Sequence, residues 1–263
     1  NVKGEKIKTK YVIASLPEEK AFLQVIQMPL MKREELEKAV YFEAENYIPL
    51  PIEEVYLDFQ TIKPIVNHLD HFDVLIAALP KRIIDSYVSC LRKAELSPKV
   101  LEIESQAISR DLIKNEVLPY PLLLIDLGAV RTNLIMFSGY SLRFTSSISF
   151  SGQRLTEAIT SDLKVDLATA EKLKTKQGMG ERKVFNAIKP LLKELVEEIK
   201  NYLIYYHTHI HHEHLPLDSK EIEKILGNFY QTEGKEIQKI IIAGNSASLP
   251  GLKEYFQNHF KKE

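Results

Sequence analysis

The residues best suited to chemistry form a turn that follows an apolar stretch. Residues 122–125 are almost wholly apolar and lead directly into Asp126, Gly128 and Thr132. A glycine lets the backbone approach a phosphate closely, a threonine offers a hydroxyl donor, and an aspartate can hold Mg²⁺ through water. The turn therefore suits the phosphate end of a nucleotide. Asp-x-Gly is equally a common hairpin turn, so both interpretations stay open at this point.

A second candidate lies near the end of the sequence. The apolar run at residues 240–243 predicts a buried strand, and it opens into the small residues Gly244, Asn245 and Ser246 before a helix predicted from Leu249. Small residues at such a place admit a flat ring or a phosphate. The alternative is an ordinary connection between a strand and a helix. If both turns are functional, we expect them to converge on one crevice.

A histidine tract is the third candidate. Five histidines crowd into eight residues and could bind Zn²⁺ or Ni²⁺ if they turned inward: His207, His209, His211, His212 and His214. Alternate positions do not share one side of a helix, and no thiolate accompanies them. We therefore interpret the tract as a solvated helix end and loop. The sequence contains no Walker motif, no His-Glu-x-x-His motif and no serine elbow.

Composition narrows the class of protein. The 263 residues are 44% hydrophobic and 27% charged, as is typical of a folded globular chain. A net charge of -1 offers no general attraction for nucleic acid or anionic lipid. The single cysteine, Cys90, excludes an internal disulfide, and no apolar run approaches the ~20 residues of a membrane helix. We expect a protein of the reducing cytoplasm.

The hydrophobic pattern predicts two α/β lobes with a ligand site between them. In the first lobe we expect a hairpin of residues 11–15 and 21–27, a helix from Lys32, strands at 55–62 and 72–79, a helix at 81–95, a strand at 99–103 and a helix at 105–116. Prolines near residue 120 predict the boundary. Beyond it we expect an antiparallel meander of residues 122–125, 133–137 and 141–144, helices at 156–163, 167–175 and 182–206, and a strand at 239–243.

The two turns, with Glu171 and Lys174 on a helix between them, resemble the nucleotide-binding superfamily of actin, Hsp70 and hexokinase. More narrowly, the chain resembles the PilM family of actin-like proteins in type IV pilus assembly. This resemblance runs across nearly the whole chain, through residues 42–51, 55–60, the Asp126 segment and residues 249–252.

The resemblance implies a two-lobed actin-like (ribonuclease H-like) α/β fold with an inserted small α+β subdomain. Residues 1–118 would form the first lobe, with the insertion at about 11–79. Residues 119–263 would form the second lobe, with a core at 119–160 and 237–263 and a helical subdomain at 161–236. The family's N-terminal phosphate hairpin would precede Asn1, so we expect a fragment whose first lobe is incomplete.

The resemblance also implies an ATP or ADP site with Mg²⁺. Asp126, Gly128 and Thr132 match the phosphate motif, with Asp126 holding Mg²⁺ through water, and Gly152 belongs to the same site. Gly244, Asn245 and Ser246 match the adenosine motif, and Glu171 and Lys174 would flank the nucleoside. Glu104 matches the acid that orients an attacking water, although an acid there could also cap a helix.

Two departures from the family pattern weaken catalysis. Asn245 and Ser151 stand where the family commonly has glycine, so a Cβ intrudes where the backbone should approach the ligand most closely. We therefore expect at most a slow Mg²⁺-dependent ATPase, and little or no turnover by this fragment alone.

The resemblance further implies a partner. A PilN-like inner-membrane protein would place its cytoplasmic N-terminal peptide in a groove beside the inserted subdomain. The chain would then be cytoplasmic, would reach the inner membrane only through this partner, and would meet other pilus assembly platform proteins there. Two alternatives remain: a nucleotide-free scaffold similar to the secretion protein GspL, and a filament protein similar to the cell-division protein FtsA.

Overall fold

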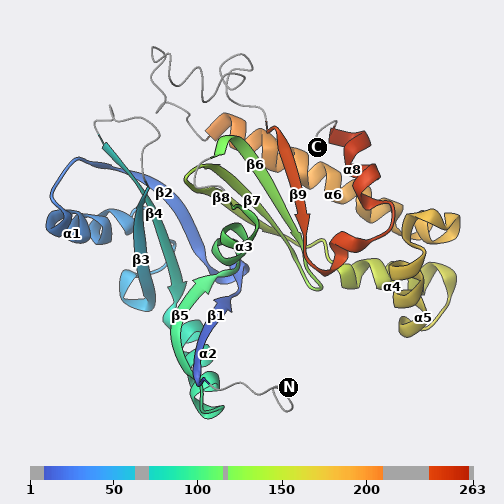
Figure 1. Ribbon diagram of the computed structural model, residues 1–263, viewed down its shortest axis with the longest axis horizontal. Helices are drawn as coiled ribbons and strands as arrows, with labels where there is room; N and C mark the ends of the chain where they lie inside the picture. Colours follow the sequence, from blue (N-terminus) through green and yellow to red (C-terminus); the bar gives the residue numbers. More distant parts are fainter. Residues whose placement is uncertain (1–8, 63–70, 115–117, 210–236, 261–263) are drawn as a thin grey trace. The chain divides into compact units, whose positions relative to one another are not determined.

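The computed structural model describes residues 9–62, 71–114, 118–209 and 237–260 (Figure 1). The chain divides into two compact units, residues 1–116 and residues 117–263. Each unit has its own strands and helices, and each is described by itself below. The boundary lies just before the proline-containing start of β6 (Leu118–Leu127).

Unit 1 contains two sheets. Strand β1 (Tyr11–Leu16) pairs in parallel with β5 (Ser97–Ile103). Strands β2 (Phe22–Pro29), β4 (His71–Pro80) and β3 (Val55–Ile62) form an antiparallel sheet in the order β2-β4-β3. The predicted strands at 55–62 and 72–79 are confirmed.

The predicted hairpin between the first two strands is wrong, because β1 and β2 belong to different sheets. The short 3-10 turn η1 (Glu18–Lys20) separates them. Its Glu18 is buried, and its Oε2 accepts a hydrogen bond of 3.1 Å from the Ser105 N–H at the start of α3 (Glu104–Leu112). This long-range contact ties the turn between the two strands to the start of α3.

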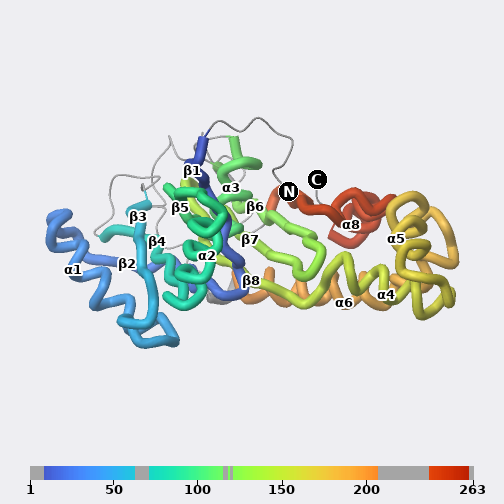
Figure 2. The backbone as a smooth tube through the Cα atoms, turned by 90° about the horizontal axis from the view of Figure 1, so that it is seen from below, coloured from blue at the N-terminus to red at the C-terminus, as the bar shows by residue number. Residues whose placement is uncertain are grey.

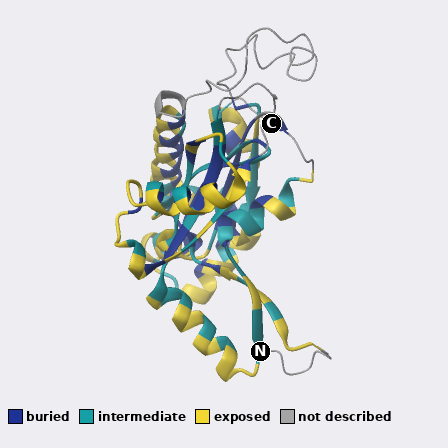
Figure 3. Ribbon diagram, turned by 90° about the vertical axis from the view of Figure 1, so that its left-hand side faces the viewer, coloured by how far each residue is buried: buried dark blue, intermediate teal, exposed yellow. Residues whose placement is uncertain are grey.

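Helix α1 (Arg33–Ala44) covers one face of the three-stranded sheet. Leu36, Val40 and Ala44 recur every four residues and share a hydrophobic core with β4 residues Val74 and Ile76. The other side of α1 is exposed (Figure 3). Helix α2 (Lys81–Lys93) follows β4 directly and contacts β4 and β5.

Unit 2 is built on one sheet in the order β8-β7-β6-β9. Strands β6, β7 (Thr132–Gly139) and β8 (Ser141–Ile148) form the predicted antiparallel meander, and this prediction is confirmed. Strand β9 (Lys239–Ala243) adds in parallel to β6. The β6 residues 122–125 are therefore paired on both sides and fully covered, which explains their continuous apolar run.

Four helices complete the described part of unit 2. They are α4 (Gly152–Leu163), α5 (Leu167–Lys176), α6 (Arg182–His209) and α8 (Leu252–Phe260), with the short turns η3 (Gly178–Gly180) and η4 (Asn245–Ser248). The predicted helices at 156–163, 167–175 and 182–206 are confirmed. Helix α6 runs along the sheet (Figures 1 and 2), and its Ile188, Leu192 and Ile199 are fully buried in the hydrophobic core of the unit.

Two sequence expectations concern membranes and metals. In the part of the chain that the structure describes, no helix has the length and apolar character needed to cross a bilayer. His207 and His209 lie in the last turn of α6, whereas His211, His212 and His214 lie outside the described residues. Within the described ranges, no group of three histidine, cysteine or acidic side chains could hold a metal ion.

Candidate functional site

The two candidate turns lie side by side in unit 2. Because β6 and β9 are parallel, with Asp126 opposite Ala243, their carboxyl ends reach the same edge of the sheet. Gly244 has φ +86, and a Cβ placed there would lie 2.5 Å from Asp126 Oδ1 and 2.6 Å from the Leu127 carbonyl oxygen. Glycine is therefore required for the two chain segments to approach this closely.

The start of α4 joins the same place. The Gly152 N–H donates to the Gly128 carbonyl at 3.0 Å, and the Gln153 N–H donates to the Ala129 carbonyl at 3.0 Å. A Cβ on Gly152 would lie 2.3 Å from Ser246 Oγ. The structure thus brings together three segments that are far apart in the sequence, centred on Gly128, Gly152 and Ser246.

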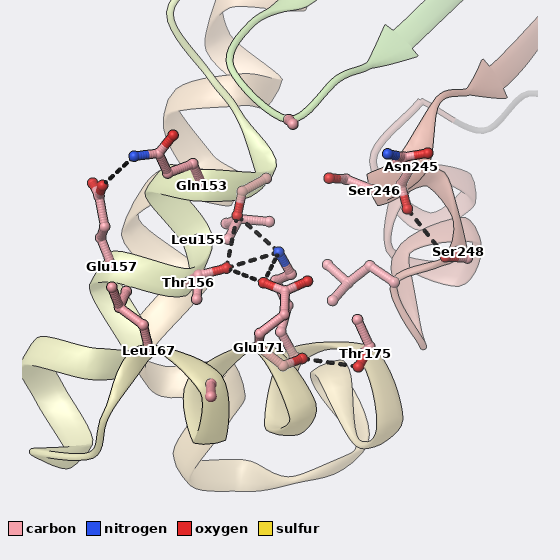
Figure 4. Close-up of a pocket in the computed structure, with 15 residues that line it drawn as sticks. Gln153, Leu155, Thr156, Glu157, Leu167, Glu171, Thr175, Asn245, Ser246 and Ser248 are labelled. Atoms are coloured by element: carbon pink, nitrogen blue, oxygen red, sulfur yellow. Dashed lines mark hydrogen bonds and ion pairs between the residues drawn. The ribbon is translucent and has the colours of Figure 1, made fainter. Parts of the chain in front are cut away.

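A pocket of about 490 Å³ opens beside these segments, wholly within unit 2 (Figure 4). Five predicted site residues line it: Gly152, Glu171, Lys174, Asn245 and Ser246. Its apolar wall comes from residues that sequence reasoning did not select, among them Ala129, Leu155, Leu167 and Leu249. Single apolar residues carry no sequence signal that separates a ligand wall from a core.

Lys174 is the centre of a polar network in this pocket. Its buried Nζ donates to the Gly152 carbonyl at 2.9 Å and to Thr156 Oγ1 at 2.8 Å, and it forms an ion pair with Glu171 Oε2 at 2.8 Å. The Thr156 hydroxyl donates to Glu171 Oε2 at 2.6 Å. All three ammonium protons therefore have protein partners. Sequence reasoning missed Thr156, although it stands one helical turn after Gly152.

The network also sets the charge state of Glu171. Burial raises the pKa of its carboxyl, but hydrogen bonds from Lys174 and Thr156 and the charge of Lys174 outweigh this effect and leave the pKa below its usual value. Glu171 is thus a carboxylate at neutral pH. Its side chain remains half exposed to the pocket.

The other predicted residues lie outside the pocket lining. Asp126, Gly128 and Gly244 lie beneath it, in the contacts between the turns. The Thr132 side chain is fully buried at the start of β7, and its hydroxyl has no hydrogen-bond partner within the described residues. Its predicted contact with a phosphate stays a prediction.

Glu104 belongs to unit 1. It is the first residue of α3, and its Oε2 accepts a hydrogen bond of 3.4 Å from the Glu18 N–H. Two reciprocal hydrogen bonds therefore join η1 to the start of α3: the Glu18 carboxylate accepts from the Ser105 N–H, and the Glu104 carboxylate accepts from the Glu18 N–H. This contact gives Glu104 a structural role, and its predicted role beside an attacking water stays a prediction.

The residues present fit a nucleotide with Mg²⁺ in part. The space beside Gly152 is taken by Ser246 Oγ, so glycine there serves the close approach of the two segments, whereas the pocket combines an apolar wall with the polar side chains of Glu171, Asn245 and Ser246. Asp126 is the one predicted metal-holding residue, so Mg²⁺ there would take its other ligands from phosphate and water.

A second hollow, of about 530 Å³, lies wholly within unit 1, and we call it the β3 groove. It is lined by five consecutive residues of β3, Tyr56 to Gln60, although successive side chains of a strand point to opposite faces. The groove therefore follows the edge of the strand. Its remaining walls come from β4, α2 and β5, including Ala77, Val88 and Leu101.

The rim of the β3 groove is polar. The Tyr56 hydroxyl donates to Asp85 Oδ1 at 3.1 Å, and this hydrogen bond to a carboxylate raises the pKa of Tyr56. Arg92, Glu102 and Gln106 also line it. Among the described strands, β3 is the last of its sheet, so its outer edge has no strand partner there.

Solved structures with a similar fold include three informative cases. A PilM chain in a PilM–PilN type IV pilus biogenesis complex matches with TM-score 0.66 and 26% identity, over 94% of this chain and 75% of that one. The ethanolamine utilization protein EutJ of Carboxydothermus hydrogenoformans matches with TM-score 0.49 and 18% identity, over 69% and 54%. MreB 5 of Spiroplasma citri, bound to AMPPNP, matches with TM-score 0.47 and 18% identity, over 70% and 59%.

The likeness to the PilM chain indicates a mixed α/β, actin-like fold. The family model described as type IV pilus assembly protein PilM matches residues 2–218, most of the sequence. The chain therefore belongs to the PilM family of type IV pilus assembly proteins.

Proposed function

We propose that this chain is a cytoplasmic adaptor of type IV pilus assembly that binds the N-terminal peptide of a PilN-like inner-membrane protein and responds to ATP. The observation that carries the proposal is the match to a PilM chain solved together with PilN, which covers 94% of the residues. The adaptor would reach the inner membrane through that peptide and would meet other platform proteins of the pilus there.

The β3 groove is our candidate for the peptide. A groove along an open strand edge supplies main-chain donors and acceptors, and an extended peptide can pair with them as an added strand. Leu75, Ala77 and Leu79 of β4 also line the groove, on the sheet face opposite to the one that α1 covers, and they add apolar surface beside the strand edge for side chains of the peptide that reach over β3. The polar rim would then select the register of the peptide.

The pocket of unit 2 is our candidate for the nucleotide. The apolar wall formed by Leu155, Leu167 and Leu249 suits the base, and the exposed carboxylate of Glu171 can accept hydrogen bonds from ribose hydroxyls. Bound Mg²⁺ would neutralise phosphate charge beside Asp126. Such binding changes peptide affinity only if the nucleotide prefers one state of the chain over another.

We expect the pocket of unit 2 to bind phosphate groups weakly. The N–H groups of Gly152, Gln153 and Arg154 at the start of α4 already donate to the Gly128 carbonyl, the Ala129 carbonyl and the Ser151 hydroxyl. Helix N-termini bind phosphate through unsatisfied N–H groups, and these three are satisfied. The three ammonium protons of Lys174 likewise already have protein acceptors. We therefore expect slow ATP hydrolysis at most.

The same observation favours a second candidate function. If satisfied N–H groups exclude the nucleotide altogether, the chain is a scaffold that keeps the fold and the peptide groove without a nucleotide response. This is the GspL-like alternative. It predicts the same peptide binding, and only the nucleotide response distinguishes it from the adaptor.

The test is a titration of the unmodified chain with a fluorescent PilN-derived N-terminal peptide, with and without Mg-ATP, together with calorimetry for the nucleotide itself. The adaptor predicts peptide binding whose affinity changes with Mg-ATP. Asp126→Ala should remove that change, whereas Asp162→Ala, an exposed carboxylate of α4 outside the pocket, should keep it.

The outcomes separate the candidates. Peptide binding without any nucleotide effect, and without nucleotide binding, would support the scaffold. Absence of peptide binding would contradict both candidates. Nucleotide binding that survives Asp126→Ala unchanged would remove Asp126 from the site.

A further inference from the structure

Two exposed surfaces of opposite charge remain outside the sites described above. Residues 34–54 contain seven acids and one base, and six of these acids are exposed: Glu34, Glu35, Glu37, Glu45, Glu53 and Glu54. We call these six the acidic patch. It covers the outer side of α1 and the turn that follows, in unit 1.

The opposite surface belongs to unit 2. Residues 172–193 contain seven bases and one acid, and six of these bases are exposed: Lys172, Lys176, Arg182, Lys183, Lys189 and Lys193. We call these six the basic patch. It covers α5 and the first half of α6. The seventh base is the buried Lys174 of the pocket network.

Neither patch is neutralised within the described residues. No ion pair there joins a side chain of either patch to an opposite charge, whereas Arg154 with Glu194 and Lys200 with Glu197 do form pairs in the same unit as the basic patch. Lys38 and Glu181 are the single opposite charges inside the two ranges. Like charges that stay unpaired repel one another, so a complementary surface would stabilise both patches.

The two patches also match in spacing. Arg182, Lys189 and Lys193 stand at i, i+7 and i+11, which places them on one side of α6. On α1 the same spacing relates Glu34, Tyr41 and Glu45, with the exposed Lys38 at i+4 in the same line. The line on α6 is therefore basic, and the line on α1 is mainly acidic and aromatic and contains one base.

The acidic patch has the apolar component that a stable interface needs. Phe42 is 75% exposed, and Tyr41 and Tyr47 are 48% and 38% exposed. Aromatic rings at a surface bind lysine and arginine through cation–π contacts and are enriched at the centres of interfaces. Exposed ion pairs alone contribute little, so these rings would supply much of the affinity.

We propose that the acidic patch of one copy of this chain docks on the basic patch of a second copy. The chain itself carries both complementary surfaces, which is why a second copy is the occupant we infer. Because the two patches differ, the contact is heterologous, and each added copy leaves one patch of each kind free. The contact therefore continues beyond a dimer, and it lies apart from the β3 groove and the pocket of unit 2.

The test begins with sedimentation velocity of the unmodified chain at rising concentration, at about 50 mM and about 500 mM NaCl, because salt screens exposed charges. The expected result is a mass that rises with concentration at low salt and an association constant at least tenfold lower at high salt. A monomer at every concentration and salt would overturn the proposal, as would association that does not depend on salt.

Charge reversal then locates the contact. E34K/E45K should be monomeric because its acidic patch is lost, and K183E/K189E should be monomeric because its basic patch is lost. Mixing the two variants should restore association, because the intact basic patch of E34K/E45K meets the intact acidic patch of K183E/K189E, and the two reversed patches are also opposite in charge. That restored association also shows that both variants are folded.

Controls of the same charge change lie on α8, at exposed residues outside both patches. K253E and E254K should associate like the unmodified chain. F42A should weaken association at least fivefold without changing its salt dependence. If the two reversed variants fail to combine, or if the α8 controls weaken association equally, the contact is not between these patches.

Discussion

The pocket of unit 2 and the β3 groove of unit 1 have similar volumes but different walls. In the pocket, Lys174, Thr156 and the first N–H groups of α4 already have protein partners. In the groove, a strand edge lines the wall along five consecutive residues. Volume therefore does not indicate the ligand. Satisfied polar groups favour a compact ligand held mainly by shape, and an open strand edge favours an extended chain.

The largest effect is expected where the two turns of unit 2 meet, next to the pocket. Gly244 has φ +86 and ψ 171, a region that is essentially restricted to glycine, and a Cβ there would collide with the backbone of Leu127. We expect Gly244→Ala to lower the free energy of unfolding of unit 2 by about 3 kcal/mol or more, and to abolish nucleotide binding.

Urea unfolding measures this effect, and Gly180→Ala is the matched control. Gly180 has no atom within 4 Å of a hypothetical Cβ, so its change should be within about 0.5 kcal/mol. Equal stability of the two variants would show that the close approach of the turns is not needed. The proposed contrast between a tightly built pocket and an open groove would then fail.

The next effect concerns the polar network. Lys174→Met keeps the length of the side chain but leaves the Gly152 carbonyl without the ammonium donor and Glu171 without its ion-pair partner, so that only the Thr156 hydroxyl still donates to Glu171. We expect a loss of about 2 kcal/mol in the free energy of unfolding and a weaker nucleotide site, with peptide affinity unchanged. Lys172→Met, on the exposed side of α5, is the control and should change stability little. Calorimetry and urea unfolding of both variants distinguish a network from a surface charge.

A substitution in the β3 groove should change peptide binding without changing nucleotide binding. Ala77 lies on the groove side of β4, and Ala77→Arg would place a long charged side chain where the peptide is proposed to lie. We expect at least tenfold weaker peptide binding, about 1.4 kcal/mol, with nucleotide affinity unchanged. Val100→Arg adds the same charge to an exposed position of β5 outside the groove and should have no effect. Loss of nucleotide binding in Ala77→Arg would show that the two sites are not separate.

The smallest effect is a dependence on pH. The pKa of Glu171 is lowered in the folded chain, so its contribution to stability is present above the unfolded pKa and is lost as pH falls through the lower folded pKa. The stability difference between the unmodified chain and Glu171→Gln should therefore shrink as pH falls from about 6 to about 3. Because the carboxyl is half exposed, the change should be small. A difference that grows on acidification would contradict the assignment of charge in the network.

The sequence by itself determined the local elements and the most promising residues. Leu36, Val40 and Ala44 predict α1 because a helix repeats about every four residues, and the run at 122–125 predicts a covered strand because it is apolar on both faces. Asp126, Gly244 and Gly152 were identifiable from residue type and from resemblance. These signals are local, or they belong to a family pattern, and both are readable without coordinates.

Only the tertiary structure decided which segments meet. The hairpin expected at the start of the chain became two strands in different sheets, because β1 pairs with β5 and β2 pairs with β4, and Glu18 between them hydrogen-bonds to Ser105, 87 residues away. Likewise, Lys174 could be selected from the sequence but not its partners, Gly152 and Thr156. A buried polar group must find a partner, yet hydrophobic periodicity carries no record of which distant group that partner is. Which distant group becomes the partner is decided by how the helices pack on the sheet.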